Sequence, residues 1–188
     1  MREPSADELR RAAAGDERML DDLVRAYYGP VYNYLYRLVG DAGEAEDLAQ
    51  EVFLRMARRV GGFGGRARFS TWLFQIARNA GIDHLRRREA ERARLPAVLE
   101  PLRSSRDAVG EYEEAQLVWS CIGTLNEDLR SALLLRDLLG FSYREIAEIL
   151  ESTLATVKWR IYAAREQVQE RYRAVTAAEP GRAPGLPR

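Results

Sequence analysis

The fold is decided by two neighbouring stretches of sequence, DLAQEVF at residues 47–53 and FSTWLFQIARNAGIDHLRRR at residues 69–88. Apolar residues recur in both stretches at every third or fourth position, which is the spacing of an amphipathic helix. The first stretch carries acids and an amide on one helix face, whereas the second mixes aromatic rings with arginines. We therefore expect two adjacent helices, one suited to a protein partner and the other to nucleic acid.

The helical period continues through the rest of the chain, and no strand-length window alternates apolar with polar residues. Gly40 ends one predicted helix and Asp41 caps the next, while Ser70 is expected to cap the helix after the glycine-rich loop. Helices are expected at residues 5–14, 16–39, 41–60 and 70–94, and in several pieces over 111–172. The sequence therefore predicts an all-α fold.

Proline, serine and glycine gather between the two helical parts, at Pro96, Pro101, Ser104, Ser105 and Gly110. Such a composition is typical of a linker. The predicted division is a first small helical domain at 1–94, a flexible linker at 95–110, a second helical domain at 111–174 and a disordered tail at 175–188.

The formal net charge is zero, but the charges are segregated along the chain. Residues 63–94 carry eight arginines and three acids, and residues 155–188 carry seven basic and three acidic groups. In the other two parts of the chain acids outnumber basic groups, by twelve to nine over 1–62 and by eleven to five over 95–154. Local positive fields attract phosphates whatever the total charge. The alternative is that both basic blocks are solvated helix faces.

Several classes of function are excluded by the residues that are missing. Cys121 is the only cysteine and is expected in the core, so no disulfide framework or thiol metal site forms. There is one histidine, no glycine-rich phosphate loop and no nucleophile–base pair, so we expect no enzyme, cofactor or metal. No signal peptide or membrane-spanning run occurs, and we expect a bacterial cytoplasmic protein.

Near the C-terminus, a short predicted helix at Ser142–Leu150 is followed by a break at 151–153 and a second helix from Leu154. Ser142–Glu145 fits the capping box, as does Thr124–Glu127 upstream. This spacing favours a helix-turn-helix, whose second helix enters the major groove. The plainer alternative is an ordinary helical hairpin. The face that a duplex would meet carries Ala155, Thr156, Lys158, Trp159, Tyr162 and Arg165.

In the N-terminal half, Asp47, Gln50, Leu54 and Arg58 share the helix face opposite the apolar stripe. A leucine among polar groups suggests a contact surface, although a solvated helix would also explain it.

Downstream, aromatic residues alternate with arginines over residues 63–88. Rings that stack on unpaired bases and guanidiniums that follow the backbone are typical of proteins that bind single-stranded nucleic acid. The alternative is that some of the rings, Trp72 among them, are simply core. Asn79 and His84 lie on the same helix.

Together these motifs resemble the sigma factors of bacterial RNA polymerase, specifically the extracytoplasmic function (ECF) subfamily. The resemblance covers Leu20–Arg88 (sigma region two) and Glu111–Arg171 (region four), and includes DLLGFSYREIAEIL at 137–150 and TVKWR at 156–160. It implies no bond-making chemistry; such a protein binds core polymerase and directs promoter recognition, strand opening and initiation.

The resemblance also implies roles for individual residues. Core polymerase, through the clamp helices of its largest subunit, would be bound by Asp47, Gln50, Glu51 and Leu54. The minus-10 element would be opened and held by Phe63, Arg66, Phe69, Asn79, His84, Arg86, Arg87 and Arg88. The minus-35 element would be read by Thr156, Lys158, Trp159, Tyr162 and Arg165. Further implied partners are the polymerase flap and an anti-sigma factor, and the active protein would be associated with the nucleoid.

The sequence departs from the family pattern within the second motif. Glu151 and Ser152 replace a glycine and an aliphatic residue, Ala155 and Trp159 replace a glycine and a serine, and Ala163 replaces a basic residue. These departures leave the minus-35 preference open. The competing hypothesis is a two-domain helix-turn-helix regulator that does not engage polymerase as a sigma; it leaves residues 47–53 and the aromatic–arginine helix without a role.

Overall fold

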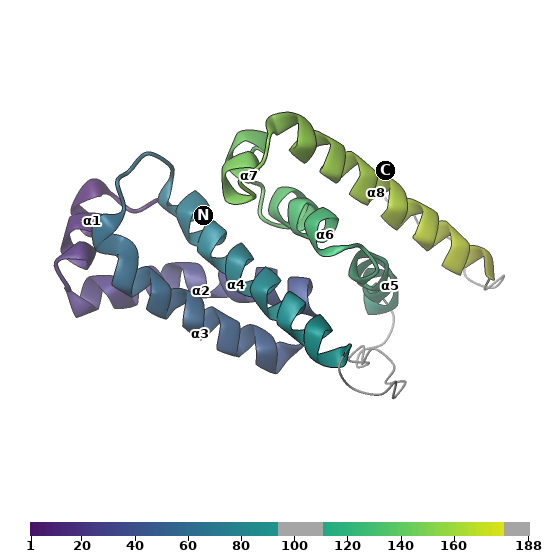
Figure 1. Cartoon of the computed structure of the whole chain (residues 1–188), viewed down its shortest axis with the longest axis horizontal. Coiled ribbons are helices and arrows are strands. Elements are labelled where there is room, and N and C mark those ends of the chain that lie inside the picture. The colour runs from purple at the N-terminus through teal and green to yellow at the C-terminus, as the bar shows by residue number, and fades with distance from the viewer. Residues whose placement is uncertain (94–110, 179–188) are drawn as a thin grey trace.

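The computed structural model describes residues 1–93 and 111–178, and every regular element in these ranges is helical. The predicted all-α fold is therefore confirmed. The elements are α1 (Ala6–Ala13), α2 (Glu17–Val39), α3 (Ala42–Arg59), the short η1 (Val60–Gly62), α4 (Phe69–Arg92), α5 (Glu111–Gly123), α6 (Glu127–Leu133), the π-helical turn η2 (Leu134–Leu138), α7 (Tyr143–Ile149) and α8 (Leu154–Ala178) (Figure 1).

Most helix starts are capped by the side chains that the sequence suggests. Asp16 and Asp41 each accept a hydrogen bond from a backbone N–H of the first turn, and Ser142 forms a capping box with Glu145. Such caps satisfy N–H groups that have no partner inside the helix.

Two predicted caps are wrong. Ser70 is 1% exposed inside α4, which begins one residue earlier because the ring of Phe69 is buried against Tyr27. At α6 the cap is Asn126, whose Oδ1 accepts from the Leu129 N–H at 2.9 Å, and not Thr124. Packing and the strong preference of asparagine for this position outweigh the sequence spacing.

The bounds of the predicted tail also change. Helix α8 continues to Ala178, so residues 175–178 are helical and not part of a disordered tail. The predicted linker at 95–110 and the rest of the tail lie outside the described residues.

The first helical unit packs α2, α3 and α4 together, with α1 and η1 at one end (Figure 1). The apolar stripe of α3 is buried along the helix, at Ala45, Leu48, Ala49, Val52 and Met56. On α2 the buried side chains include Leu23, Tyr27, Val31, Leu35 and Leu38. Helix α4 approaches α2 closely at Gly81, where a Cβ atom would lie 2.6 Å from Leu38 Cδ2. This glycine therefore sets the spacing of the two helices.

The second unit consists of α5 to α8, with α8 crossing α5, α6 and α7. Val157, Ile161 and Ala164 are buried on the inner face of α8, and Cys121 is buried in the core, as expected. Helices α7 and α8, joined at residues 150–153, form the expected helix-turn-helix.

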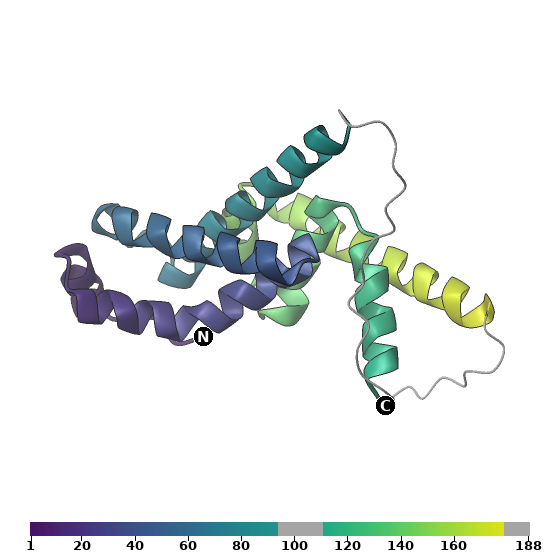
Figure 2. The ribbon, with the colours of Figure 1, turned by 90° about the horizontal axis from the view of Figure 1, so that it is seen from below.

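The two units are packed against each other, which the sequence did not predict. Helix α4 lies against α7, and α2 contacts η2, α5 and α6 (Figure 2). The Tyr34 hydroxyl and Ser131 Oγ are hydrogen-bonded at 2.6 Å and both residues are fully buried between the units. The two hydrophobic cores therefore merge into one.

Candidate nucleic-acid and protein interfaces

One candidate interface is the outer face of α3. Asp47 and Gln50 are exposed there, and Leu54 is 58% exposed although its helix buries every other large apolar side chain. Glu51 is half-buried and its Oε1 accepts a hydrogen bond from Arg55 Nη2 at 2.6 Å. Asp47, Gln50 and Leu54 thus form a ridge along one face of α3, with the apolar Leu54 one turn beyond Gln50. Glu51 flanks this ridge in its ion pair with Arg55.

A second candidate surface begins in the loop before α4. Phe63 is half-buried and its ring centroid lies 5.8 Å from that of Phe69 and 5.3 Å from that of Trp72. Phe69 is 2% exposed, so its ring supports Phe63 from below and does not reach the surface. Arg66 is exposed in the same loop. Of the predicted pair of phenylalanines, only Phe63 is available to a ligand.

The second half of α4 carries the other predicted basic contacts. Arg86 and Arg87 are exposed. Arg88 Nη1 and His84 Nε2 approach the same Glu44 oxygen, at 2.9 and 3.0 Å, and so link α4 to the first turn of α3.

Asn79 lies further toward the second helical unit. Its Oδ1 accepts a hydrogen bond from Arg78 Nη1 at 3.2 Å. Arg78 in turn contacts the second unit, so Asn79 lies at the edge of the contact between units.

The outward face of α8 is the third candidate surface. Trp159 and Tyr162 are 63% and 68% exposed, and Lys158 is exposed beside them. Thr156 is hydrogen-bonded to Thr153, which caps the helix start. Arg165 Nη2 lies 2.6 Å from Asp137 Oδ1, so its charge is partly compensated within the unit. Large exposed aromatic side chains next to a lysine are suited to a DNA groove.

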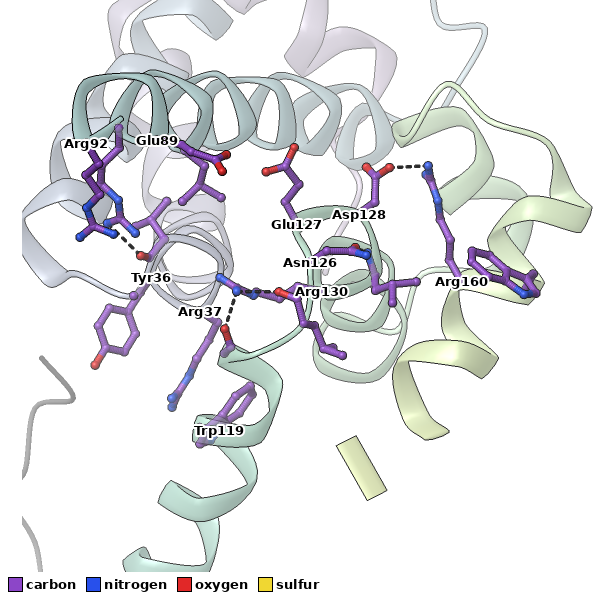
Figure 3. A pocket seen from close by; sticks show the side chains of 18 residues that line it. Tyr36, Arg37, Glu89, Arg92, Trp119, Asn126, Glu127, Asp128, Arg130 and Arg160 are labelled. Atoms are coloured by element: carbon purple, nitrogen blue, oxygen red, sulfur yellow. Dashed lines mark hydrogen bonds and ion pairs between the residues drawn. The ribbon is translucent and has the colours of Figure 1, made fainter. Parts of the chain in front are cut away.

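A cleft of about 860 Å³ opens between the units, lined by α2, α4, α5, α6 and α8 (Figure 3). Arg37 stacks on Trp119 with its Cζ 3.8 Å from the ring centroid. Arg130 donates to the carbonyl oxygens of Leu38 at 2.7 Å and Leu125 at 2.8 Å, and its burial lowers its pKa.

The sequence alone does not indicate which residues join the two units. Asp128 accepts hydrogen bonds from Arg78 of α4 at 3.0 Å and from Arg160 of α8 at 2.5 Å. No motif marks this carboxylate, and its only sequence signal is the acidic excess of residues 95–154 opposite the basic excess of 63–94.

Comparisons with known proteins identify both units. The family model of Sigma-70 region 2 matches residues 23–91, and that of Sigma-70, region 4 matches residues 115–168. The chain is 36% identical to the RNA polymerase sigma-H factor of Pseudomonas aeruginosa, over 86% of this chain and 90% of that protein. It is 33% identical to the ECF RNA polymerase sigma-E factor of Escherichia coli K12, over 87% and 91%. The chain belongs to the ECF sigma factors.

Solved structures agree with this fold. A complex of the sigma factor RpoE with the anti-sigma factor NepR from Bartonella quintana superposes with a TM-score of 0.66 at 22% identity, covering 81% of this chain and 96% of that one. CnrH in complex with the cytosolic domain of CnrY gives a TM-score of 0.66 at 25% identity, covering 92% and 96%.

Membership of the ECF sigma factors settles the broad function. The protein engages RNA polymerase, binds promoter DNA and acts in transcription initiation without being an enzyme. The competing regulator that never engages polymerase is not favoured, because the relatives match across both regions. Within the described residues, no helix is long and apolar enough to cross a membrane.

Proposed function

We propose that the α3 ridge of this ECF sigma factor binds the clamp helices of the largest polymerase subunit. Leu54 would enter an apolar contact while Asp47 and Gln50 bond the polar rim, the usual anatomy of a protein interface. The observation that carries this proposal is the 58% exposure of Leu54, one helical turn beyond those two polar side chains. Glu51 contributes at the edge through its pair with Arg55.

Strand opening is assigned to the loop before α4 and to α4 itself. Phe63 and Arg66 would capture a base extruded from the minus-10 element, with Phe69 supporting Phe63. Arg86 and Arg87 would follow the backbone, while Asn79, His84 and Arg88 would lie at the melted junction. Extruding a base costs a few kcal/mol of stacking, which binding in a pocket returns.

The outward face of α8 is assigned to the minus-35 duplex, with the polymerase flap holding region four in place. Lys158 would contact a phosphate or a guanine, and Trp159 and Tyr162 would pack on thymine methyl groups or sugars. Thr156 and Arg165 would flank them. These assignments give each domain its role: residues 1–94 bind core polymerase and open the minus-10 element, and residues 111–174 bind the minus-35 element.

An anti-sigma factor is proposed as a further partner, since one solved relative is a complex with such a protein. The cleft between the regions is lined by five arginines and three acids and suits an acidic segment. We place the working protein in the bacterial cytoplasm, at the nucleoid when it is bound to polymerase.

Two measurements test this proposal: run-off transcription with core polymerase, and the affinity of this protein for core polymerase. Replacing Asp47 and Gln50 with alanine should weaken core binding at least tenfold and leave the melting temperature unchanged. Glu46→Ala removes an exposed acid from the neighbouring face of α3 and serves as the matched control. Equal affinity of the double variant and the control would refute the interface.

A further inference from the structure

Helix α4 begins without a cap of its own. Its N-cap residue is Arg68, whose side chain makes no hydrogen bond to the first turn. The N–H groups at a helix start need an acceptor from outside the helix, and they favour negative charge. The acceptor comes from the far end of the sequence, because Glu3 Oε2 accepts a hydrogen bond from the Ser70 N–H at 3.3 Å. The other carboxylate oxygen, Oε1, is buried and lies 3.2 Å from Arg68 Nη2. Glu3 thus caps α4 and pairs with the arginine at its start.

The residue before Glu3 makes a second contact close by. Tyr27 of α2 donates a hydrogen bond from its hydroxyl to the carbonyl oxygen of Arg2 at 2.6 Å. The Tyr27 ring is 1% exposed and meets the ring of Phe69 edge to face, with centroids 5.3 Å apart. Phe69 is therefore held in two ways, through the ring of Tyr27 and through the backbone of the residue that follows it.

The loop between η1 and α4 has few bonds of its own. Among the described residues, the main chain of 63–67 makes one backbone hydrogen bond, from the Phe63 N–H to the Val60 carbonyl oxygen at 3.1 Å. Helix α1 lies against η1, where the loop starts (Figure 1). Glu3 holds the other end of the loop, at Arg68. The N-terminal segment therefore braces the loop at both of its ends.

Phe63 is the side chain that this bracing reaches. Its ring centroid lies 5.8 Å from that of Phe69, on which it rests. A side chain that is held in its bound position before the ligand arrives lowers the ordering cost of binding. Glu3 itself is unsuited to contact DNA, because a carboxylate repels phosphates and this one is engaged at the start of α4. Any effect of Glu3 on DNA must therefore pass through the aromatic rings.

We propose that Glu3 is a positioning residue for the minus-10 element: together with the Arg2 carbonyl it holds Phe69, and through it Phe63, in the orientation that receives an extruded base. This inference rests on the proposed role of the loop before α4. A purely stabilising residue would affect every activity of region two alike. A positioning residue should affect the capture of bases and leave the α3 ridge, and hence the affinity for core polymerase, unchanged.

The test measures the binding of the complete complex of core polymerase and this protein to two single-stranded oligonucleotides. One carries the minus-10 element of a promoter located by start-site mapping, and the other carries the same bases in scrambled order. Glu3→Ala should reduce the preference for the element about fivefold, the effect of losing one helix cap, at unchanged affinity for core polymerase. The substitution is made at Glu3 and not at Arg68, because Arg68 also pairs with Glu145.

Two further variants separate the hydrogen bond from the charge. Glu3→Gln keeps an oxygen that can accept from the Ser70 N–H but loses the charge that faces Arg68, so its preference should lie between those of the parent and Glu3→Ala. Asp7→Asn removes an equal charge from an exposed side chain of α1 and should behave like the parent. An unchanged preference in Glu3→Ala, or a loss of core affinity as large as the loss of oligonucleotide binding, would overturn the proposal.

Combination with Phe63→Ala identifies the route of the effect. Phe63→Ala alone should reduce the preference for the element, and adding Glu3→Ala should cost little more, because Glu3 acts through that ring. Fully additive losses would overturn the positioning role. If Phe63→Ala has no effect, the proposed function of the loop fails, and this inference fails with it. If Phe63→Ala is impaired while Glu3→Ala matches the parent, this inference alone is overturned.

Discussion

Phe74 of region two meets Phe141 of region four edge to face, with ring centroids 5.2 Å apart and an interplanar angle of 65°. Neither ring is more than a few per cent exposed, so each completes the core of the other region. Because the merged core couples the two regions, the free protein should unfold as one cooperative unit.

The hydrogen bond between Tyr34 and Ser131 offers a double-mutant test of the coupling. Tyr34→Phe leaves the buried Ser131 hydroxyl without its partner and should lower the free energy of unfolding by about 1–3 kcal/mol. Ser131→Ala alone should cost a similar amount. The double variant should lose less than the sum of the single losses, because neither polar group is then left unsatisfied. Strictly additive losses in urea unfolding would show that the two regions do not meet in solution.

Acid should weaken both the capping box at the start of α7 and the Arg68 ion pair, because both depend on the Glu145 carboxylate. Burial alone would raise the pKa of this carboxyl, but hydrogen bonds from Ser142 and Arg68 outweigh it and hold the pKa below the ordinary 4.5. A pKa that is lower in the folded chain gives stability that is complete above 4.5 and is lost as the pH falls through the folded value. The melting temperature should therefore fall between neutral pH and pH values below 4.5.

The matched variants assign that loss to one group. Glu145→Gln should be less stable than the parent at neutral pH and should show a smaller further loss in acid. Glu148→Gln alters an exposed acid of the same helix α7 and should leave the acid loss of the parent intact. An undiminished acid loss in Glu145→Gln would contradict the role given to this residue.

Gly81 should tolerate no larger residue. A Cβ there would lie 2.6 Å from Leu38 Cδ2 and 3.3 Å from Leu35 Cδ2, so Gly81→Ala must displace α2 side chains. Overpacking of this kind costs about 1–3 kcal/mol, more than the roughly 1 kcal/mol that alanine gains over glycine in a helix. Gly123→Ala, at the end of α5 with nothing within 4 Å of the new Cβ, should be neutral or stabilising. Thermal unfolding of both variants checks the sign, and a stabilised Gly81→Ala would refute the close packing of α4 on α2.

The helices and their inward faces were predictable because periodicity and capping act over a few residues. Asp16, Asp41 and Ser142 cap helices where the sequence suggested. Ser70 failed as a cap because a distant contact, Phe69 on Tyr27, extended the helix by one residue. Local sequence signals therefore predict which segments are helical, while tertiary packing decides where some of the helices begin.

The candidate surfaces were predictable only in part, for the same reason. Exposure of Leu54 and Trp159 follows from their place opposite apolar stripes. Burial of Phe69, and the shared contact of Arg78 and Arg160 with Asp128, depend on segments far apart in sequence. The segregated charges predict a nucleic-acid surface, but in the free chain part of that positive charge is compensated by region four.

Lys158 should control binding at the upstream element alone. It is exposed on the outward face of α8 and is the one lysine in the sequence, so Lys158→Ala removes a single positive charge from that face. If it contacts a phosphate, the slope of log affinity against log salt should fall by about 0.9 and binding should weaken on all promoters with a minus-35 element. Arg173→Ala removes an equal charge from the same helix, about 22 Å further along at 1.5 Å per residue, and should change neither. Run-off transcription is compared on a promoter located by start-site mapping and on the same promoter with its upstream element scrambled. A loss confined to the intact promoter supports the assignment of α8; an equal loss on both templates would place Lys158 in another step of initiation.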